Sequence, residues 1–245
     1  NFPTTVEPFN GASTGTGGEI RDRMGGGVGS WPIAGTAVYM TSYRSPLASS
    51  STQTAHSLAP RPWLYQTPEQ ILIKASNGAS EFGQPLITGS VLTFEHTENG
   101  EQYGYDKVIM LAGGVGYGTR RDCLKGTPQK GNKVVVVGGD NYRIGLGGGS
   151  VSSVETGRYS SGIELNAVQR ANPEMQKRAN NLVRALCEEE VNPVVSIHDH
   201  GSAGHVNCLS ELVEECGGRI DMAALPIGDP TLSAKEIIAN ESQER

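Results

Sequence analysis

Short clusters of glycine constrain this sequence more than any other feature. Of its 245 residues, 33 are glycine, which is about twice the ordinary share, and many stand in runs such as residues 25–27 and 147–149. The glycines show no three-residue period, which excludes a collagen-like triple helix. Since glycine lets the backbone turn sharply and approach another group closely, the clusters predict loops with close backbone contacts.

The charge and hydropathy of the chain exclude several partners. The 26 acidic residues outnumber the 20 basic ones, which leaves a net charge of -6, whereas a nucleic-acid backbone binder needs clustered Lys and Arg. No apolar run is long enough for a membrane-spanning helix. We therefore expect neither nucleic acid nor a membrane as a partner. The four cysteines have no CxxC spacing, which favours reduced, buried thiols in a cytoplasmic protein.

Strand and helix signals alternate along the chain and predict a mixed α+β or α/β fold. We expect strands at 33–43, 91–95, 107–111, 133–137, 194–197 and 220–225. We expect helices at 68–75, from 173, at 205–215 and from 233, a Gly-rich loop at 1–30 and a surface excursion at 44–64. Strands 107–111 and 133–137 are apolar on both faces, as buried sheet strands are.

Residues 11–22 (GASTGTGGEIRD) are the first segment that could carry chemistry. Glycine-rich loops bind phosphates through backbone N–H groups. The segment lacks the Lys-Ser/Thr pair of a P-loop and the spacing of the dinucleotide-binding fingerprint. Glu19 and Asp22 would repel a phosphate unless Mg²⁺ lies between them. The alternative is a flexible loop with ordinary surface acids.

A second polar segment follows the expected strand 194–197. Ligands often bind at the carboxyl ends of strands in α/β sheets, so Asp199 is a candidate ligand of a hard cation. His198, His200 and His205 could instead form the zinc site of a hydrolase. The third alternative is one buried, hydrogen-bonded histidine and two exposed ones.

Glu236 and Asn240 are four residues apart in the helix expected from Ser233, so they would share one face. Oxygen ligands on one face suit Mg²⁺ when a carboxylate from elsewhere joins them. Ser233 and Glu236 also fit an S-x-x-E capping box, which by itself explains Glu236. Both interpretations stay open at this point.

Residues 138–150 (GGDNYRIGLGGGS) follow the expected strand 133–137 and predict a second phosphate-binding turn. Arg143 is placed in it to pair with an anion in a bidentate manner. The alternative is a tight glycine turn without a ligand.

These segments, in this order, resemble the formylglycinamide ribonucleotide amidotransferase family, also called phosphoribosylformylglycinamidine synthases. The resemblance lies in residues 11–22, 109–114 (IMLAGG), 145–149 (GLGGG), 168–175 (VQRANPEM), 197–199 (IHD) and 240–245 (NESQER). It covers essentially the whole chain but only the central part of the larger family enzyme. We therefore expect a fragment of the synthetase domain.

The resemblance implies a truncated PurM-like (AIR-synthetase-like) fold. Its N-terminal lobe would span 1–125, its C-terminal α/β lobe 126–225, and the following repeat would begin at 226–245. It also implies a carbon–nitrogen ligase of purine biosynthesis that uses ATP and Mg²⁺. ATP would phosphorylate the amide oxygen of formylglycinamide ribonucleotide, and ammonia from glutamine would displace the phosphate to give formylglycinamidine ribonucleotide. The partners would be the glutaminase and the second synthetase half of the parent chain, and we expect the isolated fragment to be inactive.

The resemblance also implies site residues by position. The ATP-binding residues would be Gly11, Ala12, Ser13, Thr14, Gly15, Thr16, Gly17, Gly18, Glu19, Ile20, Arg21, Asp22 and His198. The Mg²⁺ ligands would be Asp199, Glu236 and Asn240, and the substrate-phosphate side would be Arg143, Gly147, Gly148 and Ser150. No catalytic residue is assigned, because the family's catalytic histidine would fall just before Asn1. His200 and His205 depart from the family pattern and receive no role.

Two other functions remain open from the sequence. The first is a zinc-dependent hydrolase built on His198, His200 and His205. The second is a non-catalytic nucleotide-binding module with phosphate loops and no turnover.

Overall fold

The computed structural model of the chain describes residues 2–42, 66–81, 86–105 and 107–241. Its strands are β1 (Trp31–Thr41), β2 (Leu86–Thr93), β3 (Glu95–Glu98), β4 (Glu101–Gly104) and β5 (Ile109–Tyr117). Its α-helices are α1 (Phe2–Val6), α2 (Pro8–Met24), α3 (Pro68–Glu81), α4 (Gly148–Ser152), α5 (Ser161–Ala167), α6 (Pro173–Glu188), α7 (Gly204–Leu212) and α8 (Ala234–Ile238). Short 3-10 turns lie at Arg120–Asp122 and Met222–Ala224. The surface excursion expected at 44–64 lies outside the described residues.

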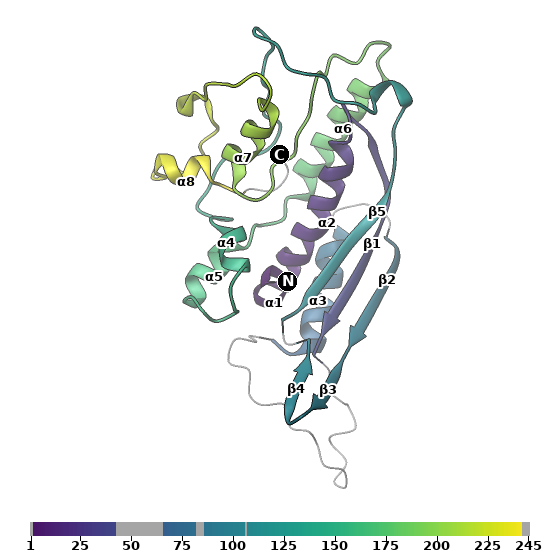
Figure 1. Cartoon of the computed structure of the whole chain (residues 1–245), viewed down its shortest axis with the longest axis vertical. Helices are drawn as coiled ribbons and strands as arrows, with labels where there is room; N and C mark the ends of the chain where they lie inside the picture. Colours follow the sequence, from purple (N-terminus) through teal and green to yellow (C-terminus); the bar gives the residue numbers. More distant parts are fainter. Residues whose placement is uncertain (1, 43–65, 82–85, 106, 242–245) are drawn as a thin grey trace.

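The central sheet has the strand order β2-β1-β5. Strand β1 runs parallel to β2 and antiparallel to β5, so that Tyr39 lies opposite both Val91 and Met110. Strands β3 and β4 form a separate antiparallel hairpin, which projects from one end of the molecule (Figure 1). The strands expected at 33–43, 91–95 and 107–111 are confirmed, with boundaries shifted by a few residues.

Helices α2 and α3 cover one face of this sheet (Figure 1). Their contact with the sheet forms a core of small and aromatic side chains, namely Ala12, Ala37, Tyr39, Ala75, Ala79 and Met110. None of the helices in the described residues covers the opposite face (Figure 1), and Leu111 and Val115 on it are 52% and 54% exposed. The expectation that residues 107–111 are buried on both faces is therefore wrong.

The expectation of a loop at residues 11–22 is also wrong, because these residues form most of helix α2. Its glycines lie where other segments approach within contact distance. A Cβ atom at Gly11 would lie 2.3 Å from the carbonyl carbon of Pro3 in α1. A second close approach lies between α2 and α3, where a Cβ atom at Gly78 would lie 2.0 Å from the carbonyl oxygen of Phe9. This close helix packing outweighs the loss of about 1 kcal/mol that a helical glycine causes relative to alanine.

The other helix predictions are confirmed. Helix α6 begins after Asn172, whose side chain accepts a hydrogen bond from the backbone N–H of Met175. Helix α8 begins after Ser233, which forms the expected capping box with Glu236. Helices α3 and α7 also lie where the sequence places them. Within the described ranges, no helix has the length and apolar character needed to cross a bilayer.

The strands expected at 133–137, 194–197 and 220–225 are absent from the described structure, so these three predictions are wrong. Residues 133–137 are extended, but no ladder partner lies beside them in the described chain. Val134 and Val135 are consequently 57% and 74% exposed. Residues 194–197 are held instead by single contacts, such as the bond from the Gly126 N–H to the Val195 carbonyl at 2.7 Å.

Candidate functional site

A cavity of about 540 Å³ is lined by the C-terminal end of helix α2, with Arg21 and Met24. Extended residues 133–137 and 193–199 form part of its wall, together with helices α6 and α7. The wall is mostly apolar, with Val134, Val135, Val136, Val137, Leu182, Leu186, Val195 and Leu212. Polar side chains also line it, namely Arg21, Asn132, Lys133, Ser196, His198, Asp199 and His200. We call Arg21, His198, Asp199 and His200 the charged region of this mostly apolar cavity.

Asp199 in this charged region interacts with the carboxylate of Asp22, which follows the lining residue Arg21 in helix α2. Partial burial raises the pKa of Asp22, and the charge and hydrogen bond of Asp199 raise the pKa of Asp22 further. Asp22 comes from the predicted ATP-binding segment, and Asp199 is a predicted metal ligand. The fold therefore brings together two residues that the sequence analysis assigned to one nucleotide site.

Basic groups lie next to this acidic pair. Lys125 donates a short hydrogen bond to the Ile197 carbonyl, and burial lowers the pKa of Lys125. Burial also lowers the pKa of His198, and the positive charge of Lys125 contributes to that shift. The imidazole Nδ1 of His198 lies 3.5 Å from a carboxylate oxygen of Glu211. Lys125 and Glu211 were not singled out by the sequence, because each is an isolated charge without a motif.

The predicted ATP-binding segment does not present a backbone cradle. In helix α2 the N–H groups point along the helix and bond to carbonyl groups one turn earlier, as in the bond from the Gly11 N–H to Glu7 at 2.7 Å. Of residues 11–22, only Arg21 lines the cavity. Its guanidinium donates to the Gln176 side chain of α6 at 3.3 Å. The roles of residues 11–22 and His198 in ATP binding stay predictions.

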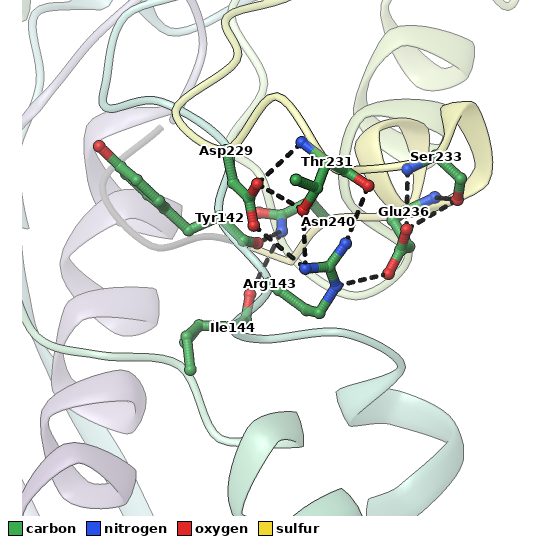
Figure 2. A network of polar contacts seen from close by, with 8 residues as sticks. All are labelled: Tyr142, Arg143, Ile144, Asp229, Thr231, Ser233, Glu236 and Asn240. Atoms are coloured by element: carbon green, nitrogen blue, oxygen red, sulfur yellow. Dashed lines mark hydrogen bonds and ion pairs between the residues drawn. The ribbon is translucent and has the colours of Figure 1, made fainter.

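Arg143, predicted to bind a substrate phosphate, is bound to the chain itself (Figure 2). It donates from Nε to Glu236 at 3.0 Å and from Nη1 to Asp229 at 3.1 Å. It also donates to the hydroxyl and the carbonyl oxygen of Thr231, at 3.1 Å and 3.0 Å. The Arg143 hydrogen bond is the main reason why the pKa of Glu236 falls to about 2.

Asn240, predicted to share a helix face with Glu236, lies beyond the end of α8. It is fully buried, and its Nδ2 donates to the carbonyl oxygens of Tyr142 and Ile144 at 2.5 Å and 3.2 Å. Figure 2 shows both bonds. The expectation of a shared helix face is therefore wrong, because the helix ends at Ile238.

The predicted Mg²⁺ set does not fit together in this structure. Asp199 interacts with Asp22, whereas Glu236 binds Arg143 and Asn240 binds backbone carbonyls. In the part of the chain that the structure describes, no three His, Cys, Asp or Glu side chains are grouped to hold a metal ion. No step through a metal ion is therefore derived for these residues.

The predicted substrate-phosphate turn is occupied by a side chain of the protein. Gly147 adopts a positive φ of 67° before α4, and Ser150 is exposed. The buried carboxylate of Glu241 accepts hydrogen bonds from the N–H groups of Gly149 at 3.4 Å and Ala203 at 3.1 Å. A Cβ atom at Gly148 would lie 2.6 Å from this carboxylate. The sequence offered no specific signal for Glu241.

The three histidines of the zinc hypothesis do not converge on one point. Nε2 of His200 and Nδ1 of His205 are 2.7 Å apart, and Nε2 of His205 lies 3.2 Å from Oδ1 of Asn141. His200 and His205 are both buried, whereas His198 turns to Glu211. The zinc site and the expectation of a single buried histidine are both wrong.

Comparison with known families defines the class of protein. Residues 129–245 match the family described as AIR synthase related protein, C-terminal domain. The fold is shared with the solved structure titled "T. maritima PurL complexed with FGAR", at a TM-score of 0.68 and 23% identity. That match covers 100% of this chain and 35% of the other. The match to "T. maritima PurL complexed with ATP" has a TM-score of 0.60 at 21% identity, over 98% and 33% of the two chains. The expected PurM-like α+β fold is confirmed.

The full-length relatives are more specific. The chain is 40% identical over 259 residues to phosphoribosylformylglycinamidine synthase of Dictyostelium discoideum, and 40% identical over 257 residues to that of Homo sapiens. Each match covers 100% of this chain and 19% of the relative. The chain is therefore homologous over its whole length to a segment of phosphoribosylformylglycinamidine synthases, which confirms the resemblance seen in the sequence. It spans about a fifth of the length of these relatives.

Proposed function

We propose that this chain supplies part of the synthetase of a glutamine-dependent ligase that converts formylglycinamide ribonucleotide to formylglycinamidine ribonucleotide with ATP. The observation that carries the proposal is the 40% identity to phosphoribosylformylglycinamidine synthases over the full chain. The proposed partners are the glutaminase that releases ammonia and the second synthetase half. Magnesium remains part of the proposed reaction, although its ligands are not assigned.

In this proposal the nucleotide approaches the charged region of the cavity. His198 and Asp199 follow directly after the extended segment that lines the wall. The lowered pKa of His198, caused by burial, favours a neutral imidazole that can donate or accept a hydrogen bond. Arg21 and Lys125 add positive charge close by. Arg143 would have to leave Asp229 and Glu236 before it could bind a phosphate.

A segment exchange tests the proposal directly. Residues 1–245 replace the matching segment of the Dictyostelium discoideum relative, and turnover is measured with ATP, formylglycinamide ribonucleotide and either glutamine or ammonia. We expect turnover with both nitrogen sources, and loss of turnover when Asp199→Asn is added. A Glu155→Gln exchange serves as the control, because Glu155 is exposed, does not line the cavity and lies outside residues 138–150.

The outcomes separate the alternatives. A folded chimera that is inactive with both nitrogen sources contradicts the proposal. A chimera that works only with ammonia points to a lost glutaminase contact and keeps the synthetase assignment. The chain alone, with ammonia, ATP and substrate, should show no turnover, and normal turnover would disprove the expected dependence on the missing parts.

We also propose a cytoplasmic location. The supporting observation is that all four cysteines are free thiols, as is usual in reducing compartments. Labelled full-length protein found in a secreted fraction would contradict it.

A further inference from the structure

The segment from Asp229 to Glu241 is fastened to the turn at residues 141–145 by a dense set of polar contacts. Arg143 is at its centre and binds Asp229, Thr231 and Glu236 (Figure 2). Asn240 adds two bonds to the same turn. The Glu241 N–H then donates to the Gly145 carbonyl at 3.0 Å. We call Arg143, Asp229, Thr231 and Glu236 the Arg143 clamp.

Both carboxylate oxygens of Glu236 are used within this arrangement. Oε1 accepts from Arg143, and Oε2 accepts from the N–H and the hydroxyl of Ser233, each at 2.8 Å. A metal ion bound by Glu236 would have to replace these bonds. It would also lie close to the Arg143 guanidinium, whose positive charge repels a divalent cation.

The orientation of the Asn240 side chain is also fixed by hydrogen bonds within the protein. Its amide nitrogen donates to two backbone carbonyls that are themselves part of the turn. These bonds satisfy polar groups that burial would otherwise leave without a partner. Rotation of the amide toward a metal ion would break them in a fully buried position.

We infer that Glu236 and Asn240 are not metal ligands but positioning residues, which together with Arg143 hold the Glu241 carboxylate between helices α4 and α7. Glu241 follows Asn240 directly, and its carboxylate binds the N–H groups of Gly149 and Ala203. These two groups stand at the starts of two different helices. The Arg143 clamp, Asn240 and Glu241 together therefore join the turn, both helix starts and the segment from Asp229 to Glu241. The inference goes beyond the proposed function, and its readouts do not use turnover.

A double-mutant cycle on the full chain tests the inference. The variants are Arg143→Met, Glu236→Gln and the pair together, and the thermal midpoint is measured with and without Mg²⁺. We expect each single change to lower the midpoint, and the double change to lower it by less than the two falls added together. We expect Mg²⁺ to have the same effect on wild type and on Glu236→Gln. Additive losses, or a Mg²⁺ stabilisation that Glu236→Gln abolishes, would overturn the inference.

Amide hydrogen exchange separates positioning from a general loss of stability. In each single variant we expect exchange at Gly149 and Ala203 to become several-fold faster than in wild type. The rate at the core amide of Ala12 should increase much less, because opening of the clamp is local. The matched control is Arg184→Met with Glu188→Gln, an exposed ion pair within α6. It should leave exchange at Gly149 and Ala203 unchanged. If Glu236→Gln does not fold, Glu236→Asp takes its place, and unchanged protection at both amides in a folded variant contradicts the inference.

Discussion

The carboxylates of Asp22 and Asp199 interact, although they come from opposite halves of the chain. Asp22 lies in the last turn of helix α2, and Asp199 lies in the segment that lines the cavity. Two neighbouring carboxylates that are both charged oppose folding unless a proton or a cation neutralises one of them. Ionisation of both carboxylates therefore lowers the stability of the folded chain.

Asp22→Asn should stabilise the chain at neutral pH. Burial and Asp199 raise the pKa of Asp22 above its ordinary value of 3.8, so the folded state releases this proton less readily than the unfolded state. The resulting stability is present below pH 3.8 and is lost as pH rises through the raised pKa. The variant should thus have a higher thermal midpoint than wild type at pH 7, with a smaller difference at lower pH. Asp140→Asn is the control. An equal rise of its thermal midpoint would show that the effect of Asp22→Asn does not come from burial and from Asp199.

Glu236 should make the chain sensitive to acid. Its pKa of about 2 lies below the ordinary 4.5, so its contribution to stability is present above pH 4.5 and is lost as pH falls toward 2. Wild type should be more stable than Glu236→Gln at pH 7, and the two should converge near pH 2 in urea titrations. Glu155→Gln, at an exposed carboxylate, should follow wild type over the whole range. A constant difference between wild type and Glu236→Gln would contradict this expectation.

Gly78→Ala should destabilise the contact between helices α2 and α3. The new methyl carbon would lie 2.0 Å from the carbonyl oxygen of Phe9, so the helices must separate, at a loss of about 1–3 kcal/mol. Gly162→Ala in α5 is the matched control, because nothing lies within 4 Å of its Cβ position. There the same change should stabilise by about 0.5–1 kcal/mol. Urea unfolding of both variants measures the contrast, and equal effects would show that helix packing does not require Gly78.

The four thiols should react in two classes. Cys123 and Cys216 are exposed, whereas Cys187 and Cys208 are buried. Burial raises the pKa of Cys208 to about 11, which keeps it protonated at neutral pH. A disulfide reagent followed by absorbance should give two fast equivalents and two slow ones, and urea should make all four fast. Cys208→Ser should remove one slow equivalent only, so a change in the fast phase would refute this expectation.

The predictions that rested on local signals were confirmed. Asn172-Pro173 and Ser233-x-x-Glu236 specify helix starts through neighbouring atoms, and the structure has both. The β-branched and aromatic residues at 33–41 form part of the central strand for a similar reason. Such signals need no knowledge of the rest of the fold.

The wrong predictions depended on what lies next to a segment in space. The glycines of residues 11–22 looked like a loop, but they serve contacts with α1 and with β5, which only the folded chain reveals. Residues 133–137 have strand composition, yet a strand also needs a partner, and none lies beside them in the described residues. Arg143 pairs with Glu236, and no sequence pattern connects these two predicted ligand-binding residues.

The pairing of β1 with β5 has a consequence for the rate at which this chain folds. Trp31 lies opposite Tyr117, and β2, which pairs with the other edge of β1, also follows only after α3. Such non-local pairing gives a high contact order, and the entropy of closing the intervening loop must be lost before any ladder bond forms. Helices α2 and α3 can therefore form early. The sheet that they cover forms later, because β1 can pair with β2 and β5 only after the polypeptide between them has been synthesised and the strands have come together.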